Sequence, residues 1–487
     1  MIRARAGAGR NIRSATGLGS IGFRAATMME WWTAYPAAVP VNGPRPREGI
    51  VCYAGPTSLM IRLASLFLIA TASISFAQQA VDPYPPVIFV HGNGDDASRW
   101  VPTIWLFESN GYPANRLFAI RFLDPVGRAD DSKPELFRSS TIDEASELSA
   151  MVTRVLLETK APKVVLIGSS RGGMTIRNYL KNAGGAAVVS HAILAGAPNH
   201  GVIAMDAMPN MEFNGRGIYL KQLNEGGEVQ TGVRFLTLRS DKLDKYAQPG
   251  GSGYEGPALQ GAENVVIPNL DHRELAFQPK AFAEMYKFLM GNAPARLDVE
   301  RQVEPVISGL VTGYGAGAPT NRPLAGVHFR VFALRPDSAE RAGSAALDVF
   351  TSENGVWGPL KISPAQRYEF VMEKDGRTVT YFRAPIPRST TFMNLRFVPG
   401  AKGPADQLSV QVSRPQGYLM QGRDPLLLDG DGVQGLDEKI PTRDSVVLKI
   451  PSAKRAGVKV ELRGETIEAR PAGDPAVELS IAELVWE

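Results

Sequence analysis

The spacing of hydrophobic positions changes near residue 292, and this change separates two kinds of predicted structure. Before it, short apolar runs alternate with segments of helical periodicity. The apolar runs lie at 87–90, 117–122, 164–167, 192–195, 234–238 and 264–267, and the helical segments at 143–160, 173–182 and 279–290. This alternation predicts βαβ units that form a parallel central sheet with helices on both faces.

After residue 292 the helical periodicity fades, and proline, glycine and turn pairs become frequent. Strand-like runs lie at 327–333, 368–372, 378–382, 408–412, 445–450 and 458–462. Their spacing is typical of a β-sandwich or barrel. We therefore predict an α/β domain at 80–295 and an all-β C-terminal region, divided into a sandwich-like domain at 296–388 and a second β-rich domain at 389–487.

The first 77 residues differ from the rest of the chain in charge. They hold eight arginines, no lysine and two acidic residues. The whole chain has a formal net charge of +4, but the remainder holds 45 basic and 47 acidic residues and is close to neutral. A basic surface suited to nucleic acid is therefore not expected, and we predict no nucleic-acid partner.

Residues 60–77 have the order of features found in a secretory signal peptide. Arg62 precedes an apolar run at 63–76, and Ser75 and Ala77 stand at the −3 and −1 positions of a cleavage site. The run is shorter than the ~20 residues of a membrane-spanning helix. We predict cleavage near Ala77 and a secreted or periplasmic mature form without an integral membrane segment. A buried helix is the alternative.

Residues 1–59 precede that segment and show no apolar periodicity. Two interpretations are open: translation begins at Met60 and the upstream stretch is a misassigned start, or the stretch is a disordered extension. The single cysteine of the chain, Cys52, lies in it. The predicted mature form therefore has no disulfide and no cysteine nucleophile.

Residues 168–172 read Gly-Ser-Ser-Arg-Gly, which fits G-x-S-x-G with Ser170 at its centre. A predicted strand enters this motif and a predicted helix leaves it. A sharp strand-to-helix turn lifts the serine hydroxyl above the sheet, and the start of the helix points backbone N–H groups at a developing oxyanion. The motif predicts an α/β-hydrolase fold with Ser170 as the nucleophile; an ordinary glycine-rich turn is the alternative.

A second motif, His91-Gly92-Asn93-Gly94, directly follows the first predicted strand. In α/β-hydrolases this loop supplies one of the two oxyanion donors, and the residue after the nucleophile supplies the other. We therefore assign the backbone N–H groups of Asn93 and Arg171 to the oxyanion hole. His91 is interpreted as a structural brace for the loop rather than as the base.

The base and the acid should follow the serine in the order Ser, Asp, His. Of the five histidines, His272 follows the last predicted strand and precedes the last helix, where the base of this fold lies. Asp241 and Asp244 both follow the strand at 234–238. Asp244 starts a D-x-x-x-x-P turn that is common in this fold, so we prefer Asp244 and keep Asp241 as the alternative.

No cofactor or metal site is predicted. The segment at 429–438 is faintly similar to a calcium-binding loop, but Val433 and Ile440 stand where ligands are required. A hairpin turn is the better interpretation.

The segments that carry these motifs resemble secreted bacterial and archaeal lipases that join a minimal α/β-hydrolase domain to a C-terminal β-domain. The resemblance is carried by residues 87–100, 167–175, 194–201, 238–249 and 271–277. It implies hydrolysis of carboxylic esters with acylglycerol-like substrates, and thus a lipid or ester partner. In some members the acid follows the strand that ends here at 195–197, where this chain has no Asp. The acid is therefore left to Asp244 or Asp241.

Residues 198–231 form a long insert between two predicted strands and are rich in methionine and aliphatic residues. A loop of this length usually has a function, and a lid over an acyl pocket fits the composition; an inert insert is the alternative. A polyester depolymerase is a rival within the same reaction class. A non-catalytic binding or adhesion protein with a decayed hydrolase domain is a rival outside it.

Overall fold

Six parallel strands form the central sheet of the computed structural model, which describes residues 83–246, 256–398, 407–474 and 476–485. The strand order is β2-β1-β3-β4-β5-β6. The strands are β1 (Val87–Val90), β2 (Leu117–Ala119), β3 (Val164–Ser169), β4 (Val189–Ala195), β5 (Arg234–Arg239) and β6 (Glu263–Val266). The predicted parallel sheet is confirmed.

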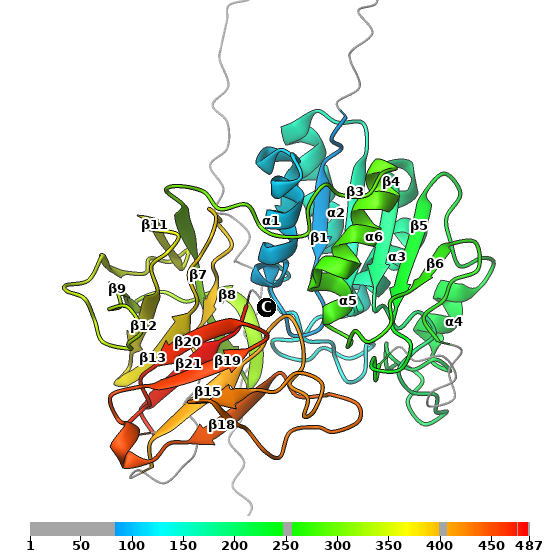
Figure 1. Ribbon diagram of the computed structural model, residues 1–487. Coiled ribbons are helices and arrows are strands. Elements are labelled where there is room, and N and C mark those ends of the chain that lie inside the picture. The colour runs from blue at the N-terminus through cyan, green and yellow to red at the C-terminus, as the bar shows by residue number, and fades with distance from the viewer. Residues whose placement is uncertain (1–82, 247–255, 399–406, 475, 486–487) are drawn as a thin grey trace, which may run out of the picture. The chain divides into compact units, whose positions relative to one another are not determined.

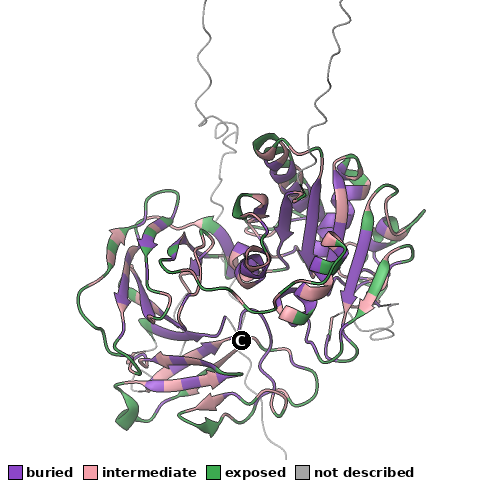
Figure 2. Ribbon diagram, turned by 45° about the horizontal axis from the view of Figure 1, so that its top comes forward, coloured by how far each residue is buried: buried purple, intermediate pink, exposed green. Residues whose placement is uncertain are grey.

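Helices cover both faces of this sheet (Figure 1). Helices α1 (Val101–Ser109), α5 (Glu274–Phe277) and α6 (Pro279–Met290) pack on the face that carries Val87 and Phe89. Helices α2 (Thr141–Thr159) and α3 (Arg171–Asn182) pack on the face that carries Ile88 and Val90. Both faces of β1 are buried, which explains its unbroken apolar sequence (Figure 2).

Shorter elements complete the α/β part. Helix α4 (Ile218–Asn224) packs Leu220 and Leu223 against Met174 of α3. Short 3-10 turns are η1 (Ala97–Trp100), η2 (Ala114–Arg116), η3 (Gly185–Ala187) and, in the β part, η5 (Ser452–Lys454).

The chain from residue 306 onward folds into β-sheets in which most neighbouring strands are antiparallel, as predicted. A seven-stranded sheet has the order β10-β9-β12-β13-β21-β15-β18, and two smaller sheets have the orders β11-β7-β14, with β8 paired to β7, and β17-β16-β19-β20. The strands are β7 (Val306–Gly315), β8 (Ala318–Pro323), β9 (His328–Ala333), β10 (Leu347–Phe350), β11 (Val356–Lys361), β12 (Tyr368–Lys374), β13 (Arg377–Arg383), β14 (Leu395–Arg396), β15 (Ser409–Ser413), β16 (Leu427–Leu428), β17 (Asp431–Gly432), β18 (Ser445–Lys449), β19 (Val458–Leu462), β20 (Glu465–Ala469) and β21 (Glu478–Glu483).

The seven-stranded sheet crosses the predicted division at 388–389. Strand β13 pairs in parallel with β21, and β21 pairs in parallel with β15. The division therefore separates strands that share one sheet. The α/β part and the β part belong to the same unit, Gln79–Glu487.

The N-terminal predictions, for 1–59 and for a signal peptide at 60–77, lie outside the described residues. In the ranges that the structure describes, no helix has both the length and the apolarity needed to cross a bilayer.

Candidate active site

Ser170 lies at the turn between β3 and α3 with φ 52° and ψ −121°, a conformation that residues other than glycine rarely adopt. The turn is tightly packed. A Cβ at Gly168 would lie 2.6 Å from Cδ1 of Ile176, and a Cβ at Gly172 would lie 2.4 Å from the carbonyl oxygen of Val90. The two glycines of the motif are therefore required by close contact, and Ser170 has the strained backbone geometry that the elbow motif predicts.

His272 and Asp244, both predicted for the site, continue a series of contacts that begins at Ser170. Its Oγ is 2.9 Å from Nε2 of His272, and Nδ1 of His272 is 2.8 Å from Oδ1 of Asp244. Asp244 is fully buried and His272 almost so. The ring of Tyr246 packs edge-on against the imidazole, with 4.9 Å between ring centroids. The fold thus brings together Ser170, His272 and Asp244 from three separate loops.

The rival candidates lie elsewhere. Asp241 is exposed, and its Oδ1 accepts backbone N–H groups of Lys242 and Asn269 at 2.8 and 3.1 Å. The buried His91 has its Nδ1 3.0 Å from the carbonyl oxygen of Gly92, while its Nε2 accepts the N–H of Phe122 at 3.3 Å. Burial lowers the pKa of His91. A neutral imidazole of this kind braces the loop, as the sequence indicated.

Both residues assigned to the oxyanion hole lie beside Ser170. The loop before Asn93 approaches so closely that a Cβ at Gly92 would lie 3.1 Å from Cβ of Ser170. Oδ1 of Asn93 accepts the N–H of Gly127 at 2.8 Å, which fixes the loop. Arg171 is the first residue of α3, so its N–H lies at the positive end of the helix.

A cavity of about 400 Å³ opens over Ser170 and His272. Its lining is chemically divided. The predicted insert contributes an apolar part, the insert wall, made by Pro198, Val202, Ile203, Met211 and Phe213. The C-terminal β part contributes a polar part, the β wall, made by Tyr418, Thr442 and Asp444. The sequence did not predict the second wall.

The side chain of Arg171 forms a buried cluster behind the elbow. Its guanidinium lies 2.5 Å from Oε1 of Glu144 on α2 and 2.6 Å from Oε1 of Glu212 in the insert. Burial, together with the nearby negative charge of Glu212, raises the pKa of Glu144 to about 7, although the positive charge of Arg171 lowers it. Burial also raises the pKa of Glu212. We name Arg171, Glu144 and Glu212 the Arg171 cluster; it connects the insert to the residue that follows Ser170.

A second buried cluster holds the loop that carries His272. Oδ1 of Asp271 accepts the N–H groups of Arg273 and Glu274 at 3.0 and 3.1 Å, and Oε2 of Glu274 accepts the N–H of Asp271 at 2.8 Å. These reciprocal bonds fix the start of α5, as a capping box does. They also leave two carboxylates buried side by side, which is unfavourable without cations.

The β part supplies those cations. Arg414, fully buried, lies 2.6 Å from Oε1 of Glu274 and 3.5 Å from Oδ2 of Asp271. Arg423 and Arg463 contact Glu274 at 3.0 and 2.9 Å. Both arginines also pair with Asp424. We name these three arginines and three carboxylates the Arg414 cluster.

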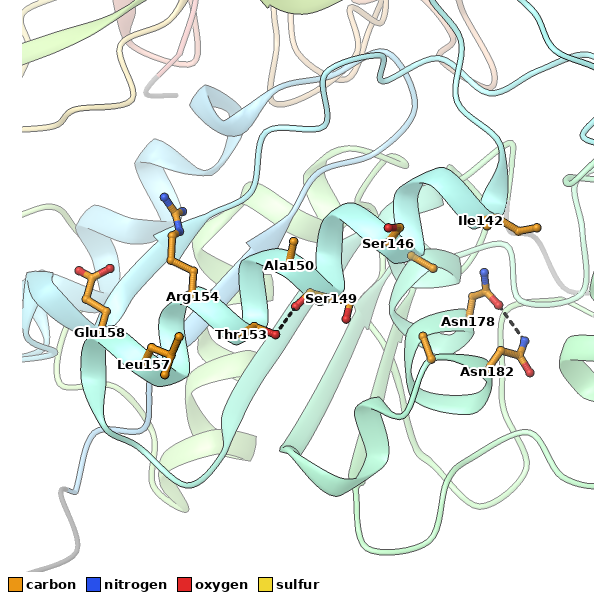
Figure 3. A pocket seen from close by; sticks show the side chains of 12 residues that line it. Ile142, Ser146, Ser149, Ala150, Thr153, Arg154, Leu157, Glu158, Asn178 and Asn182 are labelled. Atoms are coloured by element: carbon orange, nitrogen blue, oxygen red, sulfur yellow. Dashed lines mark hydrogen bonds between the residues drawn. The ribbon is translucent and has the colours of Figure 1, made fainter. Parts of the chain in front are cut away.

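A larger open hollow of about 1110 Å³ lies along α2 and α3 (Figure 3). Ile142 and Leu157 are exposed at its two ends. The described residues that line it include none of Ser170, His272 and Asp244. The smaller cavity is therefore the candidate active site.

Among the described residues, no group of three or more His, Cys, Asp or Glu side chains could hold a metal ion. The calcium-like segment begins with a hairpin: β16 and β17 pair antiparallel across Asp429 and Gly430, both with positive φ. The side chain of Asp429 accepts the N–H of Lys459 at 2.8 Å. The predicted hairpin turn is confirmed.

Residues 84–207 match the family described as lipase (class 2), and residues 306–398 match the lipase C-terminal domain. Each matched segment is less than half of the chain and is similar to the family that it matches. The predicted resemblance to bacterial-type lipases with a C-terminal β-domain is confirmed. Asn93, Ser170 and Arg171 fall within the first matched segment. His272, Asp244 and the β wall fall outside both.

Several solved structures are similar at low identity. Lipase B of Aspergillus fumigatus is 16% identical with a TM-score of 0.36, and the match covers 46% of this chain and 56% of that one. A lipase of Bacillus licheniformis is 19% identical with a TM-score of 0.30, covering 40% and 87%. Phospholipase PlaB of Legionella pneumophila is 12% identical with a TM-score of 0.31, covering 64% and 93%. The match thus spans little more than half the length of the Aspergillus lipase.

Proposed function

We propose that this chain is a secreted carboxylic-ester hydrolase, a lipase or esterase, that acts through an acyl-enzyme on Ser170. One observation carries the proposal: the unbroken series of contacts from Ser170 Oγ to His272 Nε2 at 2.9 Å and from His272 Nδ1 to Asp244 Oδ1 at 2.8 Å. A serine hydroxyl with an adjacent base, itself oriented by a buried acid, is the arrangement that makes serine nucleophilic.

In the proposed reaction, Ser170 Oγ attacks the ester carbonyl carbon while His272 takes its proton. Asp244 holds the imidazole in the required tautomer and stabilises the imidazolium. The oxyanion of the tetrahedral intermediate accepts hydrogen bonds from the backbone of Asn93 and Arg171, each worth ~3–4 kcal/mol. The bond to the alcohol oxygen then breaks, and His272 returns the proton to that oxygen. Water repeats the sequence on the acyl-enzyme, and no cofactor is used.

The substrate is proposed to be a lipid or another ester with an apolar acyl group, since the insert wall is suited to hydrocarbon. The insert at 198–231 is proposed to act as a lid. Secretion is proposed to follow cleavage of residues 60–77, so that the mature protein begins at Gln78; N-terminal sequencing of the secreted form checks this.

Hydrolysis of a chain-length series of p-nitrophenyl esters tests the proposal and defines the acyl preference. Ser170→Ala and His272→Ala should each lower kcat by at least about 10⁴-fold, because the two groups act as a unit. Asp244→Asn should cost far more activity than Asp241→Asn, its matched control. Circular dichroism confirms that each variant is folded. Substantial turnover by folded Ser170→Ala would overturn the mechanism, and a larger loss in Asp241→Asn would reverse the assignment of the acid.

A further inference from the structure

We infer that the C-terminal β part completes the active site, and that the β wall selects esters whose alcohol carries free hydroxyl groups. The inference rests on the proposed function. The β wall consists of Tyr418, Thr442 and Asp444, which line the same cavity as Ser170 and His272. All three lie outside the segments that match the two lipase families.

The β wall is bonded to residues on both sides of His272. On one side, Oδ2 of Asp271 accepts the backbone N–H of Tyr418 at 2.8 Å. On the other side, the guanidinium of Arg273 lies 3.2 Å from Oδ2 of Asp444 and donates to the carbonyl of Pro415 at 2.8 Å. The same guanidinium lies over the ring of Tyr418, 5.5 Å from its centroid. The loop of His272, Tyr418 and Asp444 are therefore bonded into one unit.

The Arg414 cluster fixes this unit from behind. Arg414 donates to the carbonyl of Tyr418 at 2.5 Å and pairs with Glu274 at 2.6 Å. Its backbone N–H donates to the carbonyl of Asp444 at 2.7 Å. One buried arginine thus joins the loop of the base to two residues of the wall.

The proton transfer in the proposed reaction determines which part of the ester contacts the β wall. His272 must deliver a proton to the leaving alcohol oxygen, so the alcohol lies on the His272 side of Ser170. That is the side to which Arg273, Tyr418 and Asp444 are bonded. The acyl chain is left to the insert wall, whose five residues are apolar.

The wall offers hydrogen-bond acceptors to an alcohol. The side chain of Asp444 keeps 39% of its surface exposed beside its pair with Arg273. Oγ1 of Thr442 donates to Asp437 at 3.0 Å, so its lone pairs can receive a hydroxyl. An alcohol with free hydroxyl groups donates hydrogen bonds to these acceptors. A plain alkyl alcohol removes water from them and offers no hydrogen bond in exchange.

The test compares kcat/KM for 1-monooctanoylglycerol and methyl octanoate, which share one acyl chain, in the mature protein. Thr442→Val and Asp444→Ala should each lower kcat/KM for the glycerol ester by about tenfold, the cost of a lost hydrogen bond in a site built for it. The loss on the methyl ester should be smaller, so that the ratio of the two kcat/KM values falls by about fivefold in each variant. Asp444→Asn, which keeps an acceptor, should retain most of the preference.

Thr466→Val, on β20 and away from the cavity, is the matched control and should leave both rates unchanged. Equal losses on both esters, or an unchanged preference in both wall variants, would overturn the inference. If Asp444→Ala does not fold, Thr442→Val carries the test, since it leaves the pair with Arg273 intact. A wild-type protein that hydrolyses neither ester would instead contradict the proposed function.

Discussion

The Arg171 cluster and the Arg414 cluster both bury arginine beside the candidate active site, but their charges differ. The Arg171 cluster places one guanidinium against two carboxylates, Glu144 and Glu212. The Arg414 cluster places three arginines against three carboxylates. Burial would raise the pKa of Glu274, but Arg414, Arg423 and Arg463 outweigh it and hold that pKa below its ordinary value. In the Arg171 cluster both carboxyl groups have raised pKa values.

The comparison shows that charge balance decides what each cluster can do. A buried carboxylate without a full share of positive charge binds a proton instead. The Arg171 cluster, which holds the insert wall through Glu212, is therefore sensitive to pH near neutrality. The Arg414 cluster, which holds the β wall, has a full share of positive charge and is ionised at neutral pH, although burial beside Glu274 raises the pKa of Asp271 to about 6.

The largest expected effect comes from removing Arg414. Arg414→Met leaves Asp271 and Glu274 buried with less positive charge, and the free energy of unfolding should fall by about 3–5 kcal/mol. Arg335→Met is the control, because Arg335 and Glu340 form a pair whose side chains are 64% and 62% exposed; it should cost less than about 1 kcal/mol. Urea unfolding measures both. Similar small losses in the two variants would remove the structural role assigned to the cluster.

The pH dependence of the free energy of unfolding measures the contribution of each cluster separately. Between its ordinary pKa of 4.5 and its folded pKa of about 7, Glu144 keeps a proton that the unfolded chain releases. The free energy of unfolding should therefore fall as pH rises through that window, by about 3 kcal/mol. Burial, with Glu274 beside it, raises the pKa of Asp271 to about 6, which adds a fall of the same sign, while the lowered pKa of its partner Glu274 adds a rise.

Glu144→Gln should remove the part of the pH dependence of unfolding free energy that comes from Glu144. The part that comes from Asp271 should remain. Glu158→Gln, an exposed site on the same helix, should leave the whole slope unchanged. Thermal or urea unfolding from pH 4 to pH 8 gives the curves. Parallel curves for wild type and Glu144→Gln would contradict the charge imbalance inferred for the Arg171 cluster.

The smallest effect concerns movement of the insert. Met205 and Met208 are 39% and 48% exposed, while Met211 and Phe213 line the cavity. An insert that opens at a lipid interface would place these two methionines against lipid. The double variant Met205→Ser, Met208→Ser should then lower activity on emulsified long-chain esters by about threefold. This corresponds to a loss of less than about 1 kcal/mol from apolar contact with the lipid. Soluble short-chain esters should be hydrolysed as before. Ile142→Ser, at an exposed apolar site on α2, is the control; equal losses on both substrates would indicate a static insert.

The sequence predicted the parts of the fold that have a local pattern. Strands buried on both faces are continuous apolar runs. The elbow motif and the order Ser, Asp, His predicted Ser170, His272 and, with Asp241 as the alternative, Asp244, which are the residues that the fold brings into contact. Helix α1 was missed because it has little polar surface. Val101 and Trp105 pack into the core of the β part, whereas Ile104 and Phe107 pack into the core beneath the central sheet. A helix buried on two sides shows no amphipathic period.

The buried clusters and the β wall had no local signal. Arg414 and Glu274 are 140 residues apart, and in the sequence each resembles an ordinary surface charge. Only the fold brings them together, since Arg414 directly follows β15 in the β part and Glu274 begins α5 in the α/β part. Long-range charge pairing of this kind carries no periodicity that a single sequence can reveal.

Covalent labelling with a fluorophosphonate tests the central claim most directly, since it needs a working serine and base but no knowledge of the natural substrate. Intact-mass spectrometry should show one adduct on the wild-type protein, mapped to Ser170, and none on Ser170→Ala; His272→Ala should react far more slowly. A folded wild-type protein that takes up no label would contradict the account and favour a decayed hydrolase domain. Label that persists at another residue in Ser170→Ala would contradict the assignment of the nucleophile.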